Sequence, residues 1–377
     1  PATVALPPLV DWPQRLRDML GNHSFIAKGG YEFDGRQIAA LDEKEIRDYA
    51  RQISDAGISA VAISCVFSMV NIEMEETAAE IVREEIPGAR ITTSHNIGRI
   101  GLLERENAAI LNACLSDLAH QTIESFSRAL GQFQLQAPLF LSQNDGTLMS
   151  AEFATAYPVL TLSSGPTNSM RGAAFLSGTK DAVVVDIGGT TTDVGVLVNG
   201  FPREASDSVR VGDVRTNFRM PDTYSFGLGG GSVVQKHPLT VGPTSVGYEL
   251  TNQGLVFGGN RLTATDIAVA AGLAEIGDRK YVAELDGQFV TNVKTHMQTM
   301  VEDAIDRMKT NPDPVPVVMV GGGSVLLGDE LDGASEVIKP DNFPVANAIG
   351  AAIAQVGGEV DVTFKLDEVP RDKALVK

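Results

Sequence analysis

The sequence predicts an α/β protein of two domains, divided near Asp181. Strand and helix patterns alternate through the first half, and two short β-branched runs in the second half each end in glycines. No low-complexity tract interrupts these patterns. At 377 residues, 43% of them hydrophobic, the chain is long enough to fill the cores of two or three domains. We therefore expect residues 1–180 and 181–377 to form separate α/β units.

In the first half, the pattern indicates a βαβ unit followed by long helices. Ile58–Val66 is a continuous apolar run, Glu73–Glu85 has the apolar spacing of a helix, and Arg90–Thr93 suits a short strand. Leu102–Leu130 contains neither glycine nor proline, which predicts one or two long helices. Further elements expected along the chain are the strands Ala137–Leu141, Val159–Leu162 and Val315–Val320 and the helices Ser169–Leu176, Thr263–Ile276, Tyr281–Lys309 and Val345–Val356.

The most informative segment is Asp186–Asp193, which reads Asp-Ile-Gly-Gly-Thr-Thr-Thr-Asp and follows the apolar run Ala182–Val185. Glycines let backbone N–H groups approach an anion, and threonine hydroxyls add further donors. The segment therefore predicts a phosphate-binding hairpin, although an ordinary hairpin in which Gly-Gly supplies the turn would share part of the pattern. The residues expected to bind phosphate are Gly188, Gly189, Thr190 and Thr191.

Two aspartates bracket this turn. Asp186 is the candidate ligand of a magnesium ion, held through water, and Asp193 is the candidate for orienting or deprotonating the phosphate acceptor. An aspartate at a strand end can equally cap its own turn, so that reading of Asp193 stays open.

Two further glycine clusters support a nucleotide site. Gly227–Ser232 follows a polar stretch, and Gly321–Ser324 follows the apolar run Val315–Val320. Neither cluster fits the dinucleotide fingerprint or the P-loop, and each alone could be a linker or a strand-to-helix turn. Three clusters in one chain nevertheless indicate one nucleotide bound from several sides. The additional residues expected to contact it are Gly229, Gly230, Gly231, Ser232, Gly321, Gly322, Gly323 and Ser324.

These motifs resemble those of a known superfamily. Asp181–Leu197 resembles the second phosphate motif of the sugar kinase, heat-shock 70 and actin superfamily, and Val317–Leu327 resembles its adenosine motif. A closer resemblance, from about Tyr31 to Gly350, is to the hydantoinase A/oxoprolinase family. The residues that carry it, besides the glycine clusters and Thr265-Asp266, are Val66–Asn71, Leu102–Asn107, Gln143–Ser150 and Ser164–Ser169.

The resemblance implies a fold and an activity. The fold is the two-domain actin/hexokinase-like (ribonuclease H-like) architecture, with a nucleotide between the domains and Gly321–Ser324 flanking the adenosine. The activity is ATP-dependent opening of a cyclic amide such as a hydantoin or 5-oxoproline, in which phosphorylation of the ring carbonyl oxygen gives an imidate phosphate that water attacks. ATP and Mg²⁺ are the implied cofactors. A B-type hydantoinase subunit is the implied partner, and a homo-oligomer is a further option.

The sequence departs from the family pattern in two places. Relatives begin with a first phosphate hairpin of the Asp-Val-Gly-Gly-Thr-Asn-Thr-Asp kind, and no such element precedes Asp186. We therefore expect a fragment whose first domain is incomplete, in which one wall of the cleft is absent. Where many relatives carry Asp-x-His before the central glycine loop, this chain has Pro221–Ser225, so no metal-binding histidine is carried over.

Asp145 lies in a family-like motif and is the second candidate catalytic residue. Arg171 and Glu104 lie in similar motifs. For all three side chains, substrate contact and structural roles as caps or interdomain ion pairs are equally compatible with the pattern.

Composition excludes several other functions. The 48 acidic and 30 basic residues give a net charge of −18, which argues against a nucleic-acid surface. No apolar run reaches the roughly 20 residues of a membrane span. Two cysteines and five histidines show no zinc spacing, and no Gly-x-Ser-x-Gly elbow occurs. We expect Cys65 and Cys114 to be buried thiols of a soluble cytoplasmic protein.

Three functions remain open at this point. The first is a subunit of an ATP-dependent cyclic amide hydrolase. The second is a small-molecule kinase or ATP-dependent carboxylase on the same scaffold. The third is a non-catalytic nucleotide-binding component, as actin and heat-shock 70 relatives illustrate.

Overall fold

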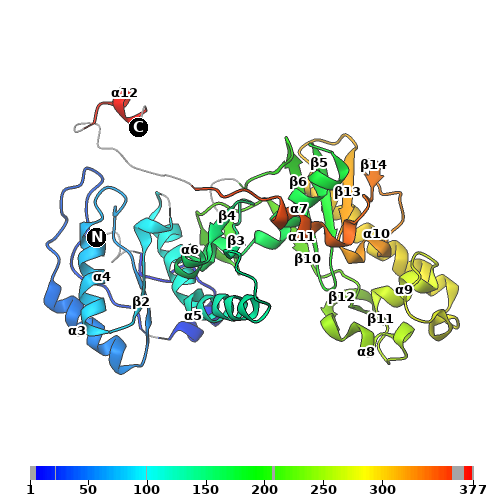
Figure 1. Cartoon of the computed structure of the whole chain (residues 1–377), viewed down its shortest axis with the longest axis horizontal. Helices are drawn as coiled ribbons and strands as arrows, with labels where there is room; N and C mark the ends of the chain where they lie inside the picture. Colours follow the sequence, from blue (N-terminus) through cyan, green and yellow to red (C-terminus); the bar gives the residue numbers. More distant parts are fainter. Residues whose placement is uncertain (1–5, 22, 99, 206–208, 359–368, 376–377) are drawn as a thin grey trace.

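The chain forms two α/β lobes, with β3 (Phe140–Ser142), β4 (Leu148–Ser150) and α6 (Ala151–Ala156) between them (Figure 1). The structure is a computed structural model that describes residues 6–21, 23–98, 100–205, 209–358 and 369–375. The mixed α/β class expected from the sequence is confirmed.

The N-terminal lobe is built on a short parallel pair of strands. β1 (Ala60–Ile63) pairs with β2 (Arg90–Thr93), and α4 (Glu73–Glu85) connects them. Because a parallel pair needs a crossover connection, this is the expected βαβ unit, and the predicted bounds of α4 and β2 are confirmed. β1 is shorter than the predicted Ile58–Val66. The other helices of this lobe are α2 (Gln14–Leu20), α3 (Glu43–Asp55) and α5 (Leu102–Gln132).

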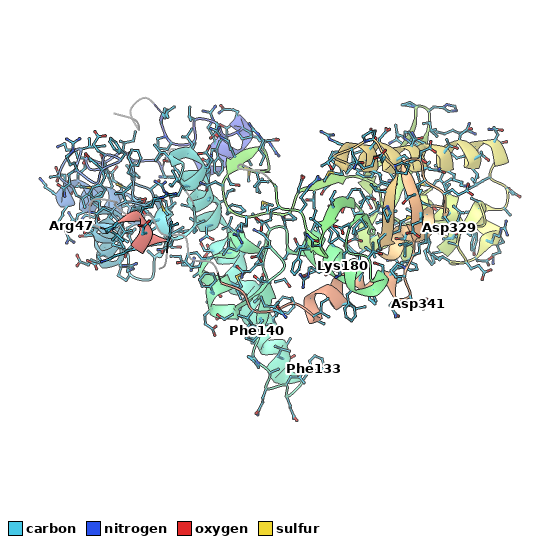
Figure 2. The ribbon with its side chains drawn as sticks, turned by 90° about the horizontal axis from the view of Figure 1, so that it is seen from above. Arg47, Phe133, Phe140, Lys180, Asp329 and Asp341 are labelled. Atoms are coloured by element: carbon cyan, nitrogen blue, oxygen red, sulfur yellow. The ribbon has the colours of Figure 1, made fainter. Side chains whose placement is uncertain are left out.

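The long segment after Leu102 forms one helix, α5, with two different halves. Its first half is buried in the lobe, whereas its end projects from the molecule, where Figure 2 shows Phe133 at the tip. Phe133 is 77% exposed. Cys114, on the same helix, is exposed and Cys65 is only partly buried, so the expectation of two buried thiols is wrong.

The predicted strand Val159–Leu162 is also wrong. Pro158–Thr161 forms a 3₁₀ turn because side chains take the hydrogen bonds that a strand partner would have made. Asn112 Oδ1 accepts from the Val159 N–H (3.2 Å), and Asn144 Nδ2 donates to the Val159 carbonyl (3.1 Å).

The C-terminal lobe contains a sheet of order β10-β6-β5-β13-β14, with the short β7 (Phe201–Pro202) beside β6. β5 pairs with β6 as an antiparallel hairpin, whereas β5, β13 and β14 are parallel to one another. β10 is antiparallel to β6 and therefore runs in the same direction as β5. The bounds of these strands are β5 Ala182–Ile187, β6 Thr192–Val198, β10 Thr223–Phe226, β13 Val315–Val320 and β14 Ala334–Ile338.

Helices cover both faces of this sheet (Figure 1). On one face, α9 (Ala264–Ala270) and α10 (Gly287–Met308) pack against the side chains that include Val183, Val185 and Ile187. On the other face, α7 (Ser164–Ser177) and α11 (Ala346–Ala352) pack against Ala182, Val184 and Leu197. Alternate residues of β5 therefore enter different cores, as the period of a strand requires. Although α7 precedes the expected division at Asp181, it lies in the core of the C-terminal lobe.

Several helix ends differ from the predictions. α7 begins five residues before Ser169. α9 ends at Ala270, and Gly272 follows with a φ of 75°. α10 begins only at Gly287, where the Asp286 side chain accepts from the Phe289 N–H (2.7 Å). Further strands and α-helices of the described residues are β8 Val209–Val211, β9 Val214–Thr216, β11 Ser232–Lys236, β12 Leu239–Ser245, α8 Leu250–Gln253 and α12 Arg371–Ala374.

Within the described ranges, no helix combines the length and the apolar character needed to cross a membrane.

Candidate functional site

The three glycine loops leave the same edge of the C-terminal sheet. β5, β10 and β13 run in one direction, and each is followed directly by one of the loops, at residues 188–191, 227–231 and 321–323. In open α/β sheets, ligands bind at the carboxyl ends of parallel strands. Segments far apart in the sequence are therefore brought to the place where a ligand is expected.

The loops touch one another through their backbones. The Gly230 N–H donates to the Gly188 carbonyl (3.1 Å), and the Gly231 N–H donates to the Gly189 carbonyl (2.7 Å). A Cβ at Gly229 would lie 2.6 Å from the carbonyl carbon of Gly189, and one at Gly323 would lie 2.7 Å from the Gly188 oxygen. Such close approach leaves no room for side chains, which explains these glycines by packing.

The two serines that end the loops are also used internally. Ser232 and Ser324 are completely buried. Ser232 Oγ accepts from the Gly229 N–H (2.9 Å), and Ser324 Oγ donates to the Val320 carbonyl (2.6 Å). The structure therefore places Gly229–Ser232 and Ser324 behind the hairpin loop as its support.

The exposed side of the site is formed by other residues of the same clusters. Gly189, Thr190, Thr191 and Gly322 are exposed. A Cβ at Gly189 or at Gly322 would meet no atom of the described residues within 4 Å, and neither residue has a left-handed φ. Packing within the protein therefore does not require glycine at these two positions. The space beside them is open to a ligand.

Backbone donors of the hairpin loop are available on this side. The Gly188 N–H is used in the turn, where it donates to the Thr191 carbonyl (2.9 Å). In the part of the chain that the structure describes, the N–H groups of Gly189 and Thr190 donate to no protein acceptor. Unpaired donors on a glycine-containing turn form a concavity suited to an anion.

A row of polar side chains crosses three strands below the loop. Asp186 on β5 lies opposite Asp193 on β6, and Asp193 lies opposite Ser225 on β10. Ser225 Oγ donates a hydrogen bond to Asp193 Oδ1. Ser169, which comes from α7, lies near the Asp186 carboxylate. The two predicted carboxylates are therefore cross-strand neighbours.

Burial destabilises the charged forms of both carboxylates. It raises the pKa of Asp186, the hydroxyl of Ser169 opposes this increase, and the neighbouring Asp193 charge adds to it. Burial likewise raises the pKa of Asp193, and the hydrogen bond from Ser225 lowers it by a smaller amount. A divalent cation at this position would relieve the repulsion between the two groups. Among the described residues, no group of three or more His, Cys, Asp or Glu side chains forms a metal cage.

Gly321 makes room for Asp186. Its φ is 82°, and a Cβ there would overlap Asp186 Oδ1 and the Ile187 carbonyl oxygen. The third loop therefore limits the space in which the Asp186 carboxylate can lie.

Asp145 lies apart from this row, in the turn between β3 and β4. Its Oδ1 accepts from the N–H of Thr147 (2.9 Å) and from the hydroxyl of Thr147 (2.7 Å). A Cβ at Gly146 would come within 2.8 Å of Thr167 Cγ2, so the turn packs directly on α7. This geometry matches the capping role left open by the sequence. The other two family-motif residues also have structural partners, since Arg171 stacks 4.2 Å from the Phe201 ring and Glu104 pairs with Arg215 at 3.3 Å.

Sequence reasoning missed Ser225 and Ser169. Ser225 could have been found, because Thr223–Phe226 alternates small polar and aromatic residues, which is typical of a strand. The sequence also gave no role to the Thr265-Asp266 motif. Thr265 Oγ1 donates to the Gly230 carbonyl (2.9 Å), and Asp266 Oδ2 accepts from the Thr263 N–H (2.7 Å) in a capping box. This motif holds the central glycine loop.

Two family models match the chain. Hydantoinase/oxoprolinase matches residues 105–281, and the hydantoinase/oxoprolinase N-terminal region matches residues 6–86. Both models describe the same family, and each matches less than half of the chain. The first model includes the hairpin and the central glycine loop of the site.

Curated proteins similar to the chain include enzyme subunits. The acetophenone carboxylase gamma subunit of Aromatoleum aromaticum is 29% identical over 251 residues, which cover 63% of this chain and 34% of that protein. The caprolactamase subunit alpha of Pseudomonas jessenii is 28% identical over 270 residues, which cover 69% of this chain and 37% of that protein. The chain thus spans little more than a third of either relative.

Two solved structures share the fold of the chain. A nucleotide-free acetone carboxylase superposes with a TM-score of 0.71 and 21% identity, over 86% of this chain and 51% of that one. The ATP-dependent caprolactamase from Pseudomonas jessenii superposes with a TM-score of 0.67 and 21% identity, over 87% of this chain and 52% of that one. The fold described above is therefore a known one.

Proposed function

We propose that the chain supplies the ATP-binding edge of an enzyme subunit that opens cyclic amides, of the hydantoinase/5-oxoprolinase type. The observation that carries the proposal is the open space at Gly189 and Gly322, which face solvent beside two partly buried carboxylates. Nothing in the packing of the protein requires glycine there, whereas a phosphate approaching the backbone does. In this proposal the lobes are the two domains of an actin/hexokinase-like architecture, with the nucleotide between them.

In this proposal, different residues of the site would bind the phosphates, the adenosine and the magnesium ion of Mg·ATP. The N–H groups of Gly189 and Thr190 and the hydroxyls of Thr190 and Thr191 would hold phosphate oxygens, and Gly321–Gly323 would lie beside the adenosine. Asp186 would hold Mg²⁺ through water, because this ion keeps several waters and takes few protein carboxylates. Bound Mg²⁺ would neutralise charge on the phosphates. The acidic pair and the open glycines fit these groups.

The chemistry must overcome the poor reactivity of an amide. The ring carbonyl oxygen would attack the γ-phosphorus of ATP, which releases ADP and gives an imidate phosphate. Water then adds to the ring carbon, the C–N bond breaks, and inorganic phosphate leaves. In this proposal the protein mainly aligns phosphate and acceptor, and Asp193 would orient the acceptor or accept its proton.

A carboxylase is the second candidate function, favoured by the acetophenone and acetone carboxylases among the similar proteins. In a carboxylase, the γ-phosphoryl group of ATP would be transferred to the oxygen of an enolised ketone. Since the curated relatives are named as gamma and alpha subunits, we propose that this chain also works with partner subunits, of which a B-type hydantoinase subunit or a second copy is the candidate.

The variant Gly189→Ala tests the binding site. We expect its affinity for Mg·ATP to fall about tenfold or more, because a Cβ would fill the space that a phosphate needs, while its melting temperature stays unchanged. Calorimetric titration of the 377-residue chain measures the affinity. Gly287→Ala is the matched control, since Gly287 is also exposed with open space around its Cβ but lies at the start of α10. Equal affinities for the two variants would refute the site.

The reaction is tested by phosphate release. Release of phosphate from Mg·ATP should depend on an added lactam, with hydantoin, 5-oxoproline and caprolactam as the probes. Dependence on acetophenone and bicarbonate instead would select the carboxylase. Nucleotide binding without phosphate release under either condition would leave the non-catalytic alternative.

A further inference from the structure

Ser225 presents a hydroxyl at the edge of the sheet where the three glycine loops begin. It is exposed, and it lies near the end of β10, two residues before Gly227, where the central glycine loop starts. Its neighbours Tyr224 and Phe226 pack against the core that α9 and α10 cover. Because successive side chains of a strand point to opposite faces, Ser225 faces the other side of the sheet.

The carboxylate of Asp193 lies on the same side, beside this hydroxyl. Asp193 is directly opposite Ser225 in the ladder between β6 and β10, and directly opposite Asp186 in the ladder between β5 and β6. The next residue, Val194, belongs to the core on the far side, as the alternation requires. Since adjacent strands lie about 4.8 Å apart, Ser225 lies roughly 10 Å from the candidate magnesium ligand Asp186.

The bond between Ser225 and Asp193 has the arrangement of a nucleophile and its general base. The Ser225 hydroxyl donates to Asp193 Oδ1, and a general base must lie within such reach of the proton that it removes. The hydroxyls of Thr192, Thr265 and Ser324 are buried and donate to backbone carbonyls instead. Exposure and a carboxylate partner therefore distinguish Ser225 from these three neighbours of the glycine loops.

We propose that Ser225 is a phosphorylation site which the chain modifies itself, with Mg·ATP bound at the glycine loops as the donor. Ser225 Oγ attacks the γ-phosphorus, an O–P bond forms, and the bond from the γ-phosphorus to the bridging oxygen breaks and releases ADP. Asp193 takes the hydroxyl proton and later passes it to water. The inference rests on the proposed function, since it needs ATP at the same edge of the sheet.

The test incubates the 377-residue chain with Mg·ATP alone and measures its intact mass. We expect a gain of one phosphoryl group, found on Ser225 by peptide fragmentation, at a rate per molecule that is independent of protein concentration. Ser225→Ala should gain none. Asp193→Asn should react about a hundredfold more slowly, because the general base is lost. Ser127→Ala, at an exposed serine of α5, is the control and should gain the full phosphoryl group.

Calorimetric titration of the same samples with Mg·ADP separates the two proposals. Binding of ADP without phosphoryl transfer, or with transfer to another residue, would overturn self-phosphorylation and leave the proposed function intact. An undiminished rate in a folded Asp193→Asn variant would also overturn it, since the reaction as written needs the carboxylate. Failure of the unmodified chain to bind nucleotide would overturn both proposals.

Discussion

Replacement of Gly321 by alanine is expected to lower the free energy of unfolding by about 3 kcal/mol or more and to remove nucleotide binding. The residue has a φ of 82°, which disfavours any side chain, and its N–H donates to the Phe343 carbonyl (2.9 Å). An added Cβ would overlap Asp186 Oδ1 and the Ile187 carbonyl oxygen. The backbone must shift, and this moves both the third glycine loop and the carboxylate. Urea unfolding and calorimetry with Mg·ADP measure the two effects.

The neighbouring glycine supplies the control. A Cβ at Gly322 would meet no atom of the described residues within 4 Å, and the residue has no left-handed φ. Gly322→Ala should therefore change the free energy of unfolding by less than about 0.5 kcal/mol, whatever it does to nucleotide affinity. Equal stability of the two variants would mean that the loop after β13 is not packed against Asp186 as described.

Glu106 is expected to make the stability of the N-terminal lobe depend on pH. It lines a cavity of about 400 Å³ beside β1, and its Oε1 is buried without a hydrogen-bond partner in the described part of the chain. Burial raises the pKa of Glu106 from 4.5 to about 7, and the negative charge of Asp11 makes a smaller contribution in the same direction. The Leu9 N–H and the charge of Arg105 lower this pKa but do not cancel the effect of burial. The folded state therefore binds a proton more tightly than the unfolded state. Stability should fall between pH 4.5 and pH 7, by up to about 3 kcal/mol, and then level off.

Glu106→Gln removes this titration because the amide stays neutral. At pH 8 the variant should be more stable than the unmodified chain by up to about 3 kcal/mol, and at pH 4.5 the difference should disappear. Denaturant unfolding at several pH values measures both. Glu80→Gln, at an exposed glutamate of α4, should leave the pH dependence unchanged. If Glu106→Gln has the same pH profile as the unmodified chain, the carboxyl is solvated.

The parts of the site that could be predicted from sequence are those with local signals. Ala182–Val185 and Val315–Val320 are β-branched runs that end in glycine, and a strand-then-glycine pattern marks a strand end without reference to the rest of the fold. The hairpin with Asp186 and Asp193 followed from these runs, and the structure shows the two aspartates paired across it. That the Gly227 cluster also follows a strand was not predicted, since β10 is short and polar.

Contacts between distant segments were beyond sequence reasoning. Ser169 and Asn347 are in contact because α7 and α11 pack closely on one face of the sheet. The sequence of neither segment contains a pattern that predicts contact with the other. The same limit explains the error at Val159, whose backbone bonds to Asn112 and Asn144 from other elements. Single-sequence patterns also could not distinguish glycines that serve packing, such as Gly229, from Gly189, which leaves open space.

The position of β13 has a consequence for how the chain acquires its site during synthesis. β13 lies between β5 and β14 in the sheet, although it follows β5 by more than a hundred residues of sequence. Until Val315–Val320 leaves the ribosome, the β5–β6 hairpin has an unpaired edge, which is a target for wrong pairing. Such long-range parallel pairing is slow to form. Nucleotide capture by nascent chains of increasing length would therefore mark the moment at which this last inner strand is inserted.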